Sequence, residues 1–110
     1  MKIAVTSASG QLGSSIVKDL MKEIGTANVV AIARTPEKAK HLGVEVRKGD
    51  YNNRQELEAA LNGVDAVLLV SGMDEPQRRI QQHRNVIEAA QANGVKKIVY
   101  AIIIGDEEKT

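Results

Sequence analysis

With 110 residues, 43% of them hydrophobic and 26% charged, the chain has the composition of one globular domain with a single core. The net charge of +1, the 2% aromatic content and the absence of cysteine argue against a nucleic-acid surface, a disulfide, a thiolate metal site and a cysteine nucleophile. No apolar run has the length of a membrane span or the pattern of a signal peptide, so we expect a cytoplasmic protein.

Short apolar runs rich in Val and Ile alternate with helical patterns along the chain, as buried parallel strands alternate with their crossovers. The first helix follows a turn of small residues and carries apolar side chains at every fourth position from Leu12 to Ile24. The predicted strands are Lys2–Thr6, Asn28–Ala33, Val44–Lys48, Ala66–Val70 and Lys97–Ile103.

The next two crossovers carry helix-start signals. Thr35 as a cap, Pro36 at the first helical position and Gly43 as a stop predict a short helix between the second and third strands. Asn53 and Glu56 have the spacing of a capping box and predict a helix that ends near the next glycine.

The last helix is the longest, and Ile80, Ile87 and Ala90 are predicted to share one of its faces. His83 falls on the same face, where a lone histidine is more often packed and hydrogen-bonded than catalytic. His41 belongs to the short second crossover, far from it in sequence, so no metal site is expected.

Strict alternation of strands and helices predicts one α/β domain over residues 1–110, with a parallel sheet covered on both faces and right-handed crossovers. The expected architecture is a Rossmann-like three-layer sandwich with the strand order 3-2-1-4-5.

The turn between the first strand and the first helix has the spacing Ser7-x-x-Gly10-x-x-Gly13. A strand, a tight turn and a helix in that order predict a cradle for a dinucleotide pyrophosphate, and a plain βα turn is the alternative. Serine in place of the usual first glycine adds a Cβ where the chain turns most tightly. Because the hydroxyls of Ser7 and Ser9 could donate to a phosphate, we expect a weakened site rather than a lost one.

Arg34 ends the second strand, 21 positions after Gly13. Folds that prefer NAD carry an acidic residue near this position to bind the ribose 2′-OH, whereas an arginine suits the 2′-phosphate of NADP. Lys38 lies one helical turn further on and could assist. The alternative is a solvated arginine at a strand end.

Several segments resemble the N-terminal part of NmrA-like atypical short-chain dehydrogenase/reductases, which typically read T-G-A-T-G-Q-L-G where this chain reads T-S-A-S-G-Q-L-G. Within that group they are most similar to NAD(P)H:quinone oxidoreductases of type 2 and to triphenylmethane reductases. The matching segments are residues 3–13, 30–39, 44–51, 82–90 and 94–100. Members of the group continue well beyond this length, with a substrate-binding region.

The resemblance implies that Asp50 and Tyr51 contact the adenine and that Ser71 and Gly72 lie beside the ribose and pyrophosphate. Both pairs could instead be plain turns. The complete predicted cofactor site, for NADP(H) with NADPH preferred over NADH, consists of Ser7, Ser9, Gly10, Gln11, Leu12, Gly13, Arg34, Lys38, Asp50, Tyr51, Ser71 and Gly72.

No catalytic residue is predicted, because neither tyrosine has a lysine four positions later: Gln55 follows Tyr51 and Ile104 follows Tyr100. The resemblance therefore implies the NADP(H)-binding domain of a reductase whose relatives use quinone or dye acceptors, with little turnover in this chain. The alternatives are a non-catalytic redox sensor that binds NADP, and an engineered or truncated Rossmann domain without activity.

The fifth strand is expected to form an edge of the sheet. Residues 98–104 are apolar and uncharged, and after Tyr100 the chain has Ala101-Ile102 where the family usually has a polar pair. Such an edge predicts a homodimer formed by edge pairing or strand exchange. Alternatively, the acidic tail could fold back and shield it.

Overall fold

The computed structural model describes residues 2–8, 10–70 and 76–101. The predicted strands are confirmed to within two residues at each described end, and the predicted continuation of the fifth strand through Ile103 lies outside the described residues. The elements are β1 (Ile3–Val5), α1 (Gln11–Ile24), η1 (Thr26–Asn28), β2 (Val29–Ala33), η2 (Pro36–Lys38), η3 (Lys40–Leu42), β3 (Glu45–Lys48), α2 (Arg54–Ala60), β4 (Ala66–Val70), α3 (Pro76–Ala92) and β5 (Lys97–Ala101).

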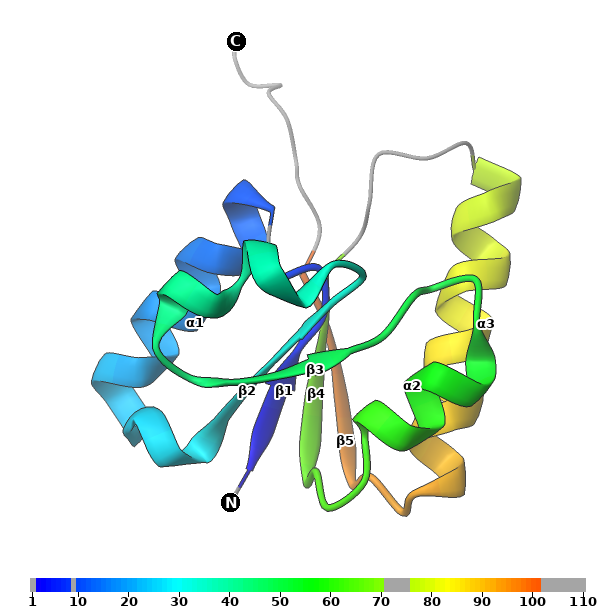
Figure 1. The fold of residues 1–110 in the computed structure, drawn as a ribbon. Coiled ribbons are helices and arrows are strands. Elements are labelled where there is room, and N and C mark those ends of the chain that lie inside the picture. The colour runs from blue at the N-terminus through cyan, green and yellow to red at the C-terminus, as the bar shows by residue number, and fades with distance from the viewer. Residues whose placement is uncertain (1, 9, 71–75, 102–110) are drawn as a thin grey trace, which may run out of the picture.

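The strands form one parallel sheet in the order β3-β2-β1-β4-β5, which confirms the predicted order. β1 is the central strand, and its Ala4 lies opposite Val30 of β2 and Val67 of β4. Because every strand is parallel, all carboxyl ends lie at the same edge of the sheet, at the top in Figure 1.

Two aliphatic clusters hold the three layers together. α1 covers one face of the sheet, and α2 and α3 cover the other (Figure 1). Side chains alternate across the sheet, so that Ala4 packs with Leu57 and Val86 of the helices on one side, while Val5 packs with Val17 of α1 on the other. The predicted Rossmann-like sandwich is therefore confirmed, with a core that contains no phenylalanine or tryptophan.

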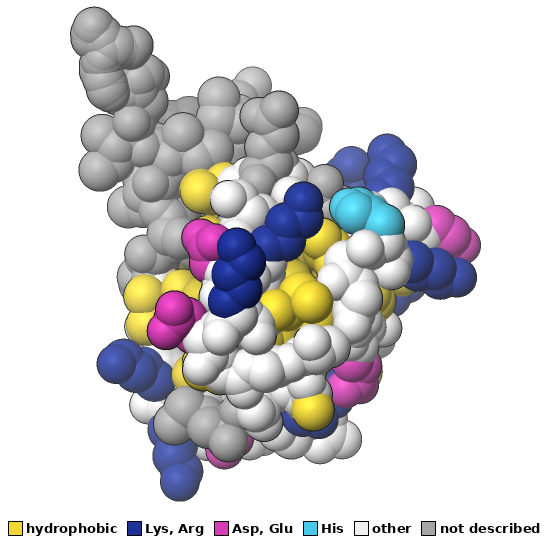
Figure 2. Space-filling view, turned by 90° about the vertical axis from the view of Figure 1, so that its left-hand side faces the viewer, with side chains coloured by type: hydrophobic (Ala, Val, Ile, Leu, Met, Phe, Trp, Pro, Cys, Tyr) yellow, Lys and Arg dark blue, Asp and Glu magenta, His cyan; other side chains and the backbone are white. Residues whose placement is uncertain are grey.

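α1 packs on the sheet through Val17, which is fully buried, while Leu12 and Ile16 of the same stripe are only half-buried. On this side of the molecule, Figure 2 shows hydrophobic side chains that reach the surface among Lys and Arg side chains. In the part of the chain that the structure describes, no helix has the length and apolarity needed to cross a membrane.

The second crossover is not the helix predicted from Thr35 and Gly43. It consists of two single 3₁₀ turns, η2 and η3, and the Thr35 side chain makes no capping bond. Ala39 and Leu42 are buried and hold the segment against the sheet. Because so short a segment gains few hydrogen bonds for the cost of nucleating an α-helix, single turns anchored by packing are favoured instead.

Ile80, His83 and Ile87 line one surface hollow of α3, as the predicted shared face implies, whereas Ala90 belongs to the buried face. Ile80 is 61% exposed, and the face against α2 and the sheet is formed by Gln82, Val86, Ala89 and Ala90. Ile80 precedes the buried Gln82 by two positions, which places it on nearly the opposite side of the helix.

Candidate functional site

The candidate site lies at the carboxyl edge of the sheet, where the segments after β1, β2 and β3 come together. Residues 7–13 lead from β1 into α1, and we call them the phosphate turn. The Ala8 N–H donates to the Ile32 carbonyl at 3.0 Å, and the Gly10 N–H donates to the Ser7 carbonyl at 3.1 Å. The first bond ties the turn to β2, and the second closes the turn on itself.

α1 begins in this turn with Gly10 as its N-cap and without a side-chain cap. The first bond within the helix runs from the Ser14 N–H to the Gly10 carbonyl at 2.9 Å. The N–H groups of Gln11, Leu12 and Gly13 precede that bond, and such groups have no acceptor within a helix. Together with the positive end of the helix dipole, they suit the start of α1 to an anion.

The two glycines of the turn serve different purposes. A Cβ on Gly13 would lie 2.1 Å from the Ser7 carbonyl oxygen, so packing alone requires glycine there. A Cβ on Gly10 would lie 3.5 Å from the same oxygen, an ordinary contact, and the Gly10 φ of −79° is open to any residue. Gly10 is exposed, so its missing side chain leaves the backbone of the turn open to a ligand.

Ser7 has a φ of 54°, in the left-handed region that favours glycine. Among the described residues it is the one non-glycine residue with a positive φ. A side chain in this conformation costs on the order of 1–2 kcal/mol. The extra Cβ of Ser7 therefore stands at a strained position, as the sequence predicted.

A chain of hydroxyl groups lies beneath the phosphate turn. The Ser7 hydroxyl donates to the Tyr51 hydroxyl oxygen at 2.9 Å. The Tyr51 proton is shared between Thr6 Oγ1 at 2.6 Å and the Val70 carbonyl at 2.5 Å. Thr6 Oγ1 also accepts from the Val70 N–H at 2.8 Å. We call Thr6, Ser7 and Tyr51, with the Val70 peptide groups, the hydroxyl cluster.

Tyr51 is fixed from several sides. Burial raises the pKa of its phenol above the ordinary value of 10.0, although the hydrogen bonds with Ser7 and Thr6 oppose that shift. The phenol is therefore neutral and able to donate at physiological pH. Its backbone carbonyl accepts from Asn85 Nδ2 of α3 at 2.8 Å. The predicted adenine contact of Tyr51 stays a prediction, because its observed contacts point toward the strand ends.

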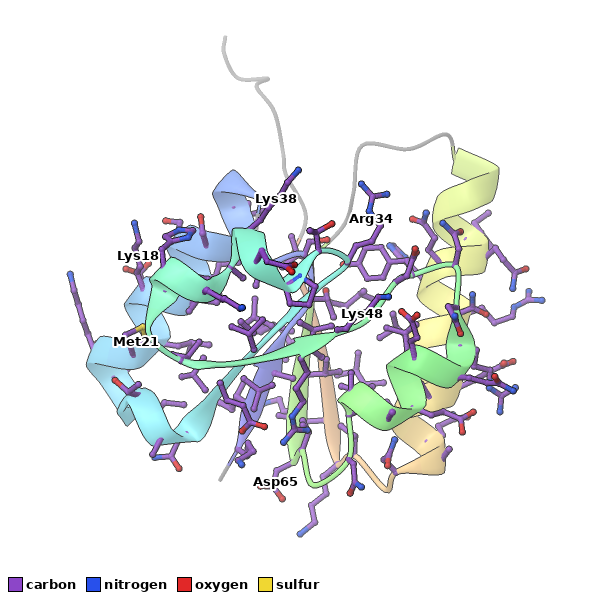
Figure 3. The ribbon with its side chains drawn as sticks, in the orientation of Figure 1. Lys18, Met21, Arg34, Lys38, Lys48 and Asp65 are labelled. Carbon is purple, nitrogen blue, oxygen red and sulfur yellow. The ribbon has the colours of Figure 1, made fainter. Side chains whose placement is uncertain are left out.

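Basic side chains gather beside the end of β2. Arg34 and Lys38 extend beyond the carboxyl edge of the sheet, with Lys48 lower on β3 (Figure 3). A hollow of about 460 Å³ is lined by Arg34, Lys40 and Lys48, with Glu37 as its acidic residue. The remaining lining residues are Thr35 and Pro36. The excess of positive charge makes this hollow suited to a phosphate group.

Asp50 forms the turn that the sequence allowed as an alternative to an adenine contact. Its carboxylate Oδ1 accepts from the Asn52 N–H at 2.9 Å, and its carbonyl accepts from the Asn53 N–H at 2.8 Å. Asn53 then caps α2 by accepting from the Glu56 N–H at 3.1 Å, which confirms the predicted helix start. The second carboxylate oxygen of Asp50 leaves room for the adenine role, which stays a prediction.

Among the remaining predicted residues, one is described only in part and three are not described. The structure describes only the backbone of Gln11, which lies in the first turn of α1. Ser9, Ser71 and Gly72 lie outside the described residues. His41 is exposed and His83 is half-buried on α3. Across the described ranges, no cluster of three or more His, Asp or Glu side chains could hold a metal ion.

Sequence reasoning missed Thr6, Lys40 and Lys48. Thr6 is fully buried at the end of an apolar strand, and a polar residue at that place was the available signal. Lys48 ends β3 beside Arg34 at the end of β2, since the register pairs Ala33 with Lys48. Its proximity to Arg34 follows from the strand order that the sequence predicted.

A family model described as NAD(P)H-binding matches residues 7–110. Quinone oxidoreductase 2 of Escherichia coli K12 is 46% identical over 105 residues, which cover 93% of this chain and 36% of that protein. An NmrA-like family domain-containing oxidoreductase of Aspergillus flavus is 32% identical over 106 residues, which cover 91% and 34%.

Solved structures agree with these matches. The Citrobacter sp. triphenylmethane reductase complexed with NADP(H) superposes with a TM-score of 0.86 at 44% identity, over 91% of this chain and 36% of that one. The predicted resemblance to NmrA-like reductases is thus confirmed. The chain spans about a third of the length of these relatives.

Proposed function

Since the chain belongs to the NAD(P)H-binding family, we propose that it binds NADP(H) at the carboxyl edge of its sheet. In this proposal the N–H groups of the phosphate turn hold the pyrophosphate. The observation that carries it is the contrast between the glycines: packing requires Gly13, whereas Gly10 is exposed and the protein itself could accommodate a side chain there. Glycine at position 10 is then explained by a ligand that approaches the backbone.

We further propose that the chain prefers NADPH to NADH. The basic hollow beside β2 supports this preference, because Arg34, Lys40 and Lys48 outnumber the carboxylates near them: Glu37 in the lining and Glu56, which lies 3.7 Å from the Lys48 ammonium. A guanidinium can hold a 2′-phosphate through two parallel hydrogen bonds, while a ribose 2′-OH offers it no charge. Lys38 is exposed in η2 and is a second contact for the same phosphate.

The adenine and the remaining phosphate contacts complete the proposed site. Asp50 accepts from the exocyclic amine through the oxygen that its turn leaves unused, and the ring of Tyr51 lies beside the base. Ser9, Ser71 and Gly72, which lie outside the described residues, complete the surroundings of the pyrophosphate and the ribose.

The bound nicotinamide supplies a hydride, and the relatives whose names include quinone oxidoreductase and triphenylmethane reductase indicate the classes of acceptor for the whole protein. The sequence holds no Tyr-x-x-x-Lys pair to donate a proton. We therefore propose that this chain contributes binding and orientation of NADPH, with little reduction of a quinone by itself.

Titration of the chain with NADPH and with NADH, followed by cofactor fluorescence and calorimetry, tests the proposal. Binding of NADPH that is tighter than binding of NADH, and that is lost in Arg34→Glu, supports it. Lys18→Glu makes the same change of charge on α1, away from the site, and is expected to bind as the wild type does (Figure 3). If both substitutions weaken NADPH binding equally, the loss is a general effect of charge and not of a contact with Arg34. If the wild type does not bind NADPH, the proposal is overturned.

A further inference from the structure

The strained Ser7 and the partly buried Tyr51 are joined by one hydrogen bond. In the described residues, the other positive φ values belong to glycines: Gly25, Gly43, Gly63 and Gly94. Ser7 is therefore the position where a side chain occupies a backbone conformation that, among the described residues, is otherwise found at glycines. Its hydroxyl donates to the Tyr51 hydroxyl at 2.9 Å.

The peptide of Ser7 determines the shape of the phosphate turn. Its carbonyl accepts from the Gly10 N–H at 3.1 Å, and the backbone of α1 at Gly13 lies directly against it. A rotation of Ser7 out of the left-handed region would move this carbonyl. Both the closure of the turn and the direction of the first N–H groups of α1 would then change.

A glycine at position 7 would have neither the strain nor the hydroxyl. Serine introduces both together, and the hydrogen bond to Tyr51 favours the conformation that the Cβ disfavours. Tyr51 is a firm anchor for that bond, because its hydroxyl contacts Thr6 and the Val70 carbonyl and its backbone is held by Asn85 of α3.

We propose that Tyr51 is a positioning residue for the pyrophosphate, which acts through its hydrogen bond to Ser7 to hold the phosphate turn in its binding conformation. This inference rests on the proposed binding of NADP(H). The single hydroxyl proton of Ser7 is directed to Tyr51, so Ser7 acts on the turn and not as a direct donor to a phosphate.

The test combines Ser7→Gly, Ser7→Ala, Tyr51→Phe and the double variant Ser7→Gly/Tyr51→Phe with two ligands. NADPH contains the pyrophosphate, whereas adenosine 2′-phosphate contains the adenine and the 2′-phosphate without it. Tyr51→Phe keeps the aromatic ring and removes only the hydroxyl. It is expected to weaken NADPH binding about fivefold, which corresponds to about 1 kcal/mol for one hydrogen bond, and to leave binding of adenosine 2′-phosphate unchanged.

In a protein with glycine at position 7, the turn does not need the hydrogen bond to Tyr51. In Ser7→Gly the turn is free of strain, so adding Tyr51→Phe is expected to change NADPH binding much less than it does beside Ser7. Ser7→Ala keeps the Cβ and loses the hydroxyl, and it is expected to bind NADPH more weakly than either the wild type or Ser7→Gly. Thermal unfolding of each variant verifies that the compared proteins are folded.

Three results would overturn the inference: equal weakening of both ligands by Tyr51→Phe, the same effect of Tyr51→Phe beside Ser7 and beside glycine, or unaltered NADPH binding in Ser7→Ala. Each of these is compatible with NADPH binding to the wild type. If the wild type binds neither adenosine 2′-phosphate nor NADPH, the proposed function itself fails, and this inference fails with it.

Discussion

The hydroxyl of Thr6 lies 2.8 Å from the N–H of Val70 and takes the place of a backbone acceptor where β1 leaves the sheet. The ladder between β1 and β4 ends with the Thr6 N–H and the Leu68 carbonyl, 3.0 Å apart. Beyond Thr6 the main chain of β1 turns away from β4, and the Thr6 side chain makes the next hydrogen bond to β4. This substitution of a hydroxyl for a carbonyl allows a tight turn directly above a fully buried strand end.

Thr6→Val is therefore expected to destabilise the protein although valine has nearly the same shape. The buried Val70 N–H loses its acceptor, and the free energy of unfolding is expected to fall by about 1–3 kcal/mol. Denaturant unfolding measures the change. Thr26→Val serves as the control, because Thr26 is exposed in η1. A loss no larger than that of the control would show that Thr6 has no such structural role.

Alanine at the two glycines of the phosphate turn is expected to separate stability from binding. Gly13→Ala places a methyl group against the Ser7 peptide and should lower the free energy of unfolding by about 1–3 kcal/mol. Gly10→Ala should change stability by less than about 0.5 kcal/mol while weakening NADPH binding about tenfold. Unfolding curves and NADPH titrations of both variants provide the comparison. A Gly10→Ala protein with unchanged affinity would contradict a pyrophosphate at this turn.

Lys48→Gln tests the basic hollow without touching Arg34. The substitution removes one positive charge from the lining, and we expect the ratio of NADPH to NADH affinity to fall about threefold. Lys96→Gln makes the same change at an exposed position that precedes β5, at the opposite edge of the sheet. The ratio of NADPH to NADH affinity should be unchanged in this control. An equal decrease of that ratio in both variants would argue against a contact between Lys48 and the 2′-phosphate.

The raised pKa of Tyr51 predicts a specific loss of stability in alkali. Because the folded state binds the phenolic proton more tightly than the unfolded state, the contribution of Tyr51 is fully present below pH of about 10 and is lost as the pH rises through the folded-state value. Unfolding of the wild type and of Tyr51→Phe, measured from neutral to alkaline pH, should show a difference in stability that shrinks above that point.

Ultraviolet absorbance provides an independent reading of the same titration, since the chain has only two tyrosines. In Tyr51→Phe the remaining signal belongs to Tyr100. The absorbance change that disappears in Tyr51→Phe is expected at a pH above the ordinary pKa of tyrosine, about 10. If that change instead occurs at the ordinary pKa, Tyr51 has no raised pKa.

β5 forms an edge of the described sheet, and Val99 on this strand is 38% exposed. We propose that copies of the chain associate into a homodimer through this edge, and Val99→Lys is expected to favour the monomer because charge discourages edge pairing. Sedimentation over a wide range of concentration measures the effect. Ile80→Lys adds the same charge on α3, where Ile80 is 61% exposed, and should leave the association unchanged. A wild-type monomer at every concentration would exclude the dimer.

The architecture could be predicted from the sequence because each buried strand is a short run of aliphatic residues between clear turns. β2 is the best example, since all of Val29–Ala33 is buried and the pattern has no polar interruption. The second crossover was mispredicted because Thr35, Pro36 and Gly43 are correct signals for the start and end of a helical segment but say nothing about its type. The packing of Ala39 and Leu42 decided between one helix and two 3₁₀ turns.

The positions of Arg34 and Asp50 at the carboxyl edge were predictable, because Arg34 follows β2 directly and Asp50 follows β3 after one residue. The hydroxyl cluster was not, because it joins Thr6, Tyr51 and Val70 through contacts between segments 19 to 64 positions apart in the chain. Spacing rules describe neighbours along one helix or strand and carry no information on such contacts. The orientation of Tyr51 toward β1 and β4 could only be seen in three dimensions.

The central position of β1 has a consequence for folding during synthesis on the ribosome. β1 precedes β2 and β4 along the chain, and the Lys2 N–H donates to the Asp65 carboxylate, 63 positions later, at the amino edge where β1 and β4 begin (Figure 3). During translation β1 can pair with β2 early, but its other side has no neighbour until β4 has emerged. The nascent chain therefore exposes one unpaired side of its central strand until β4 has emerged, a period in which a chaperone or an intermolecular contact competes with folding.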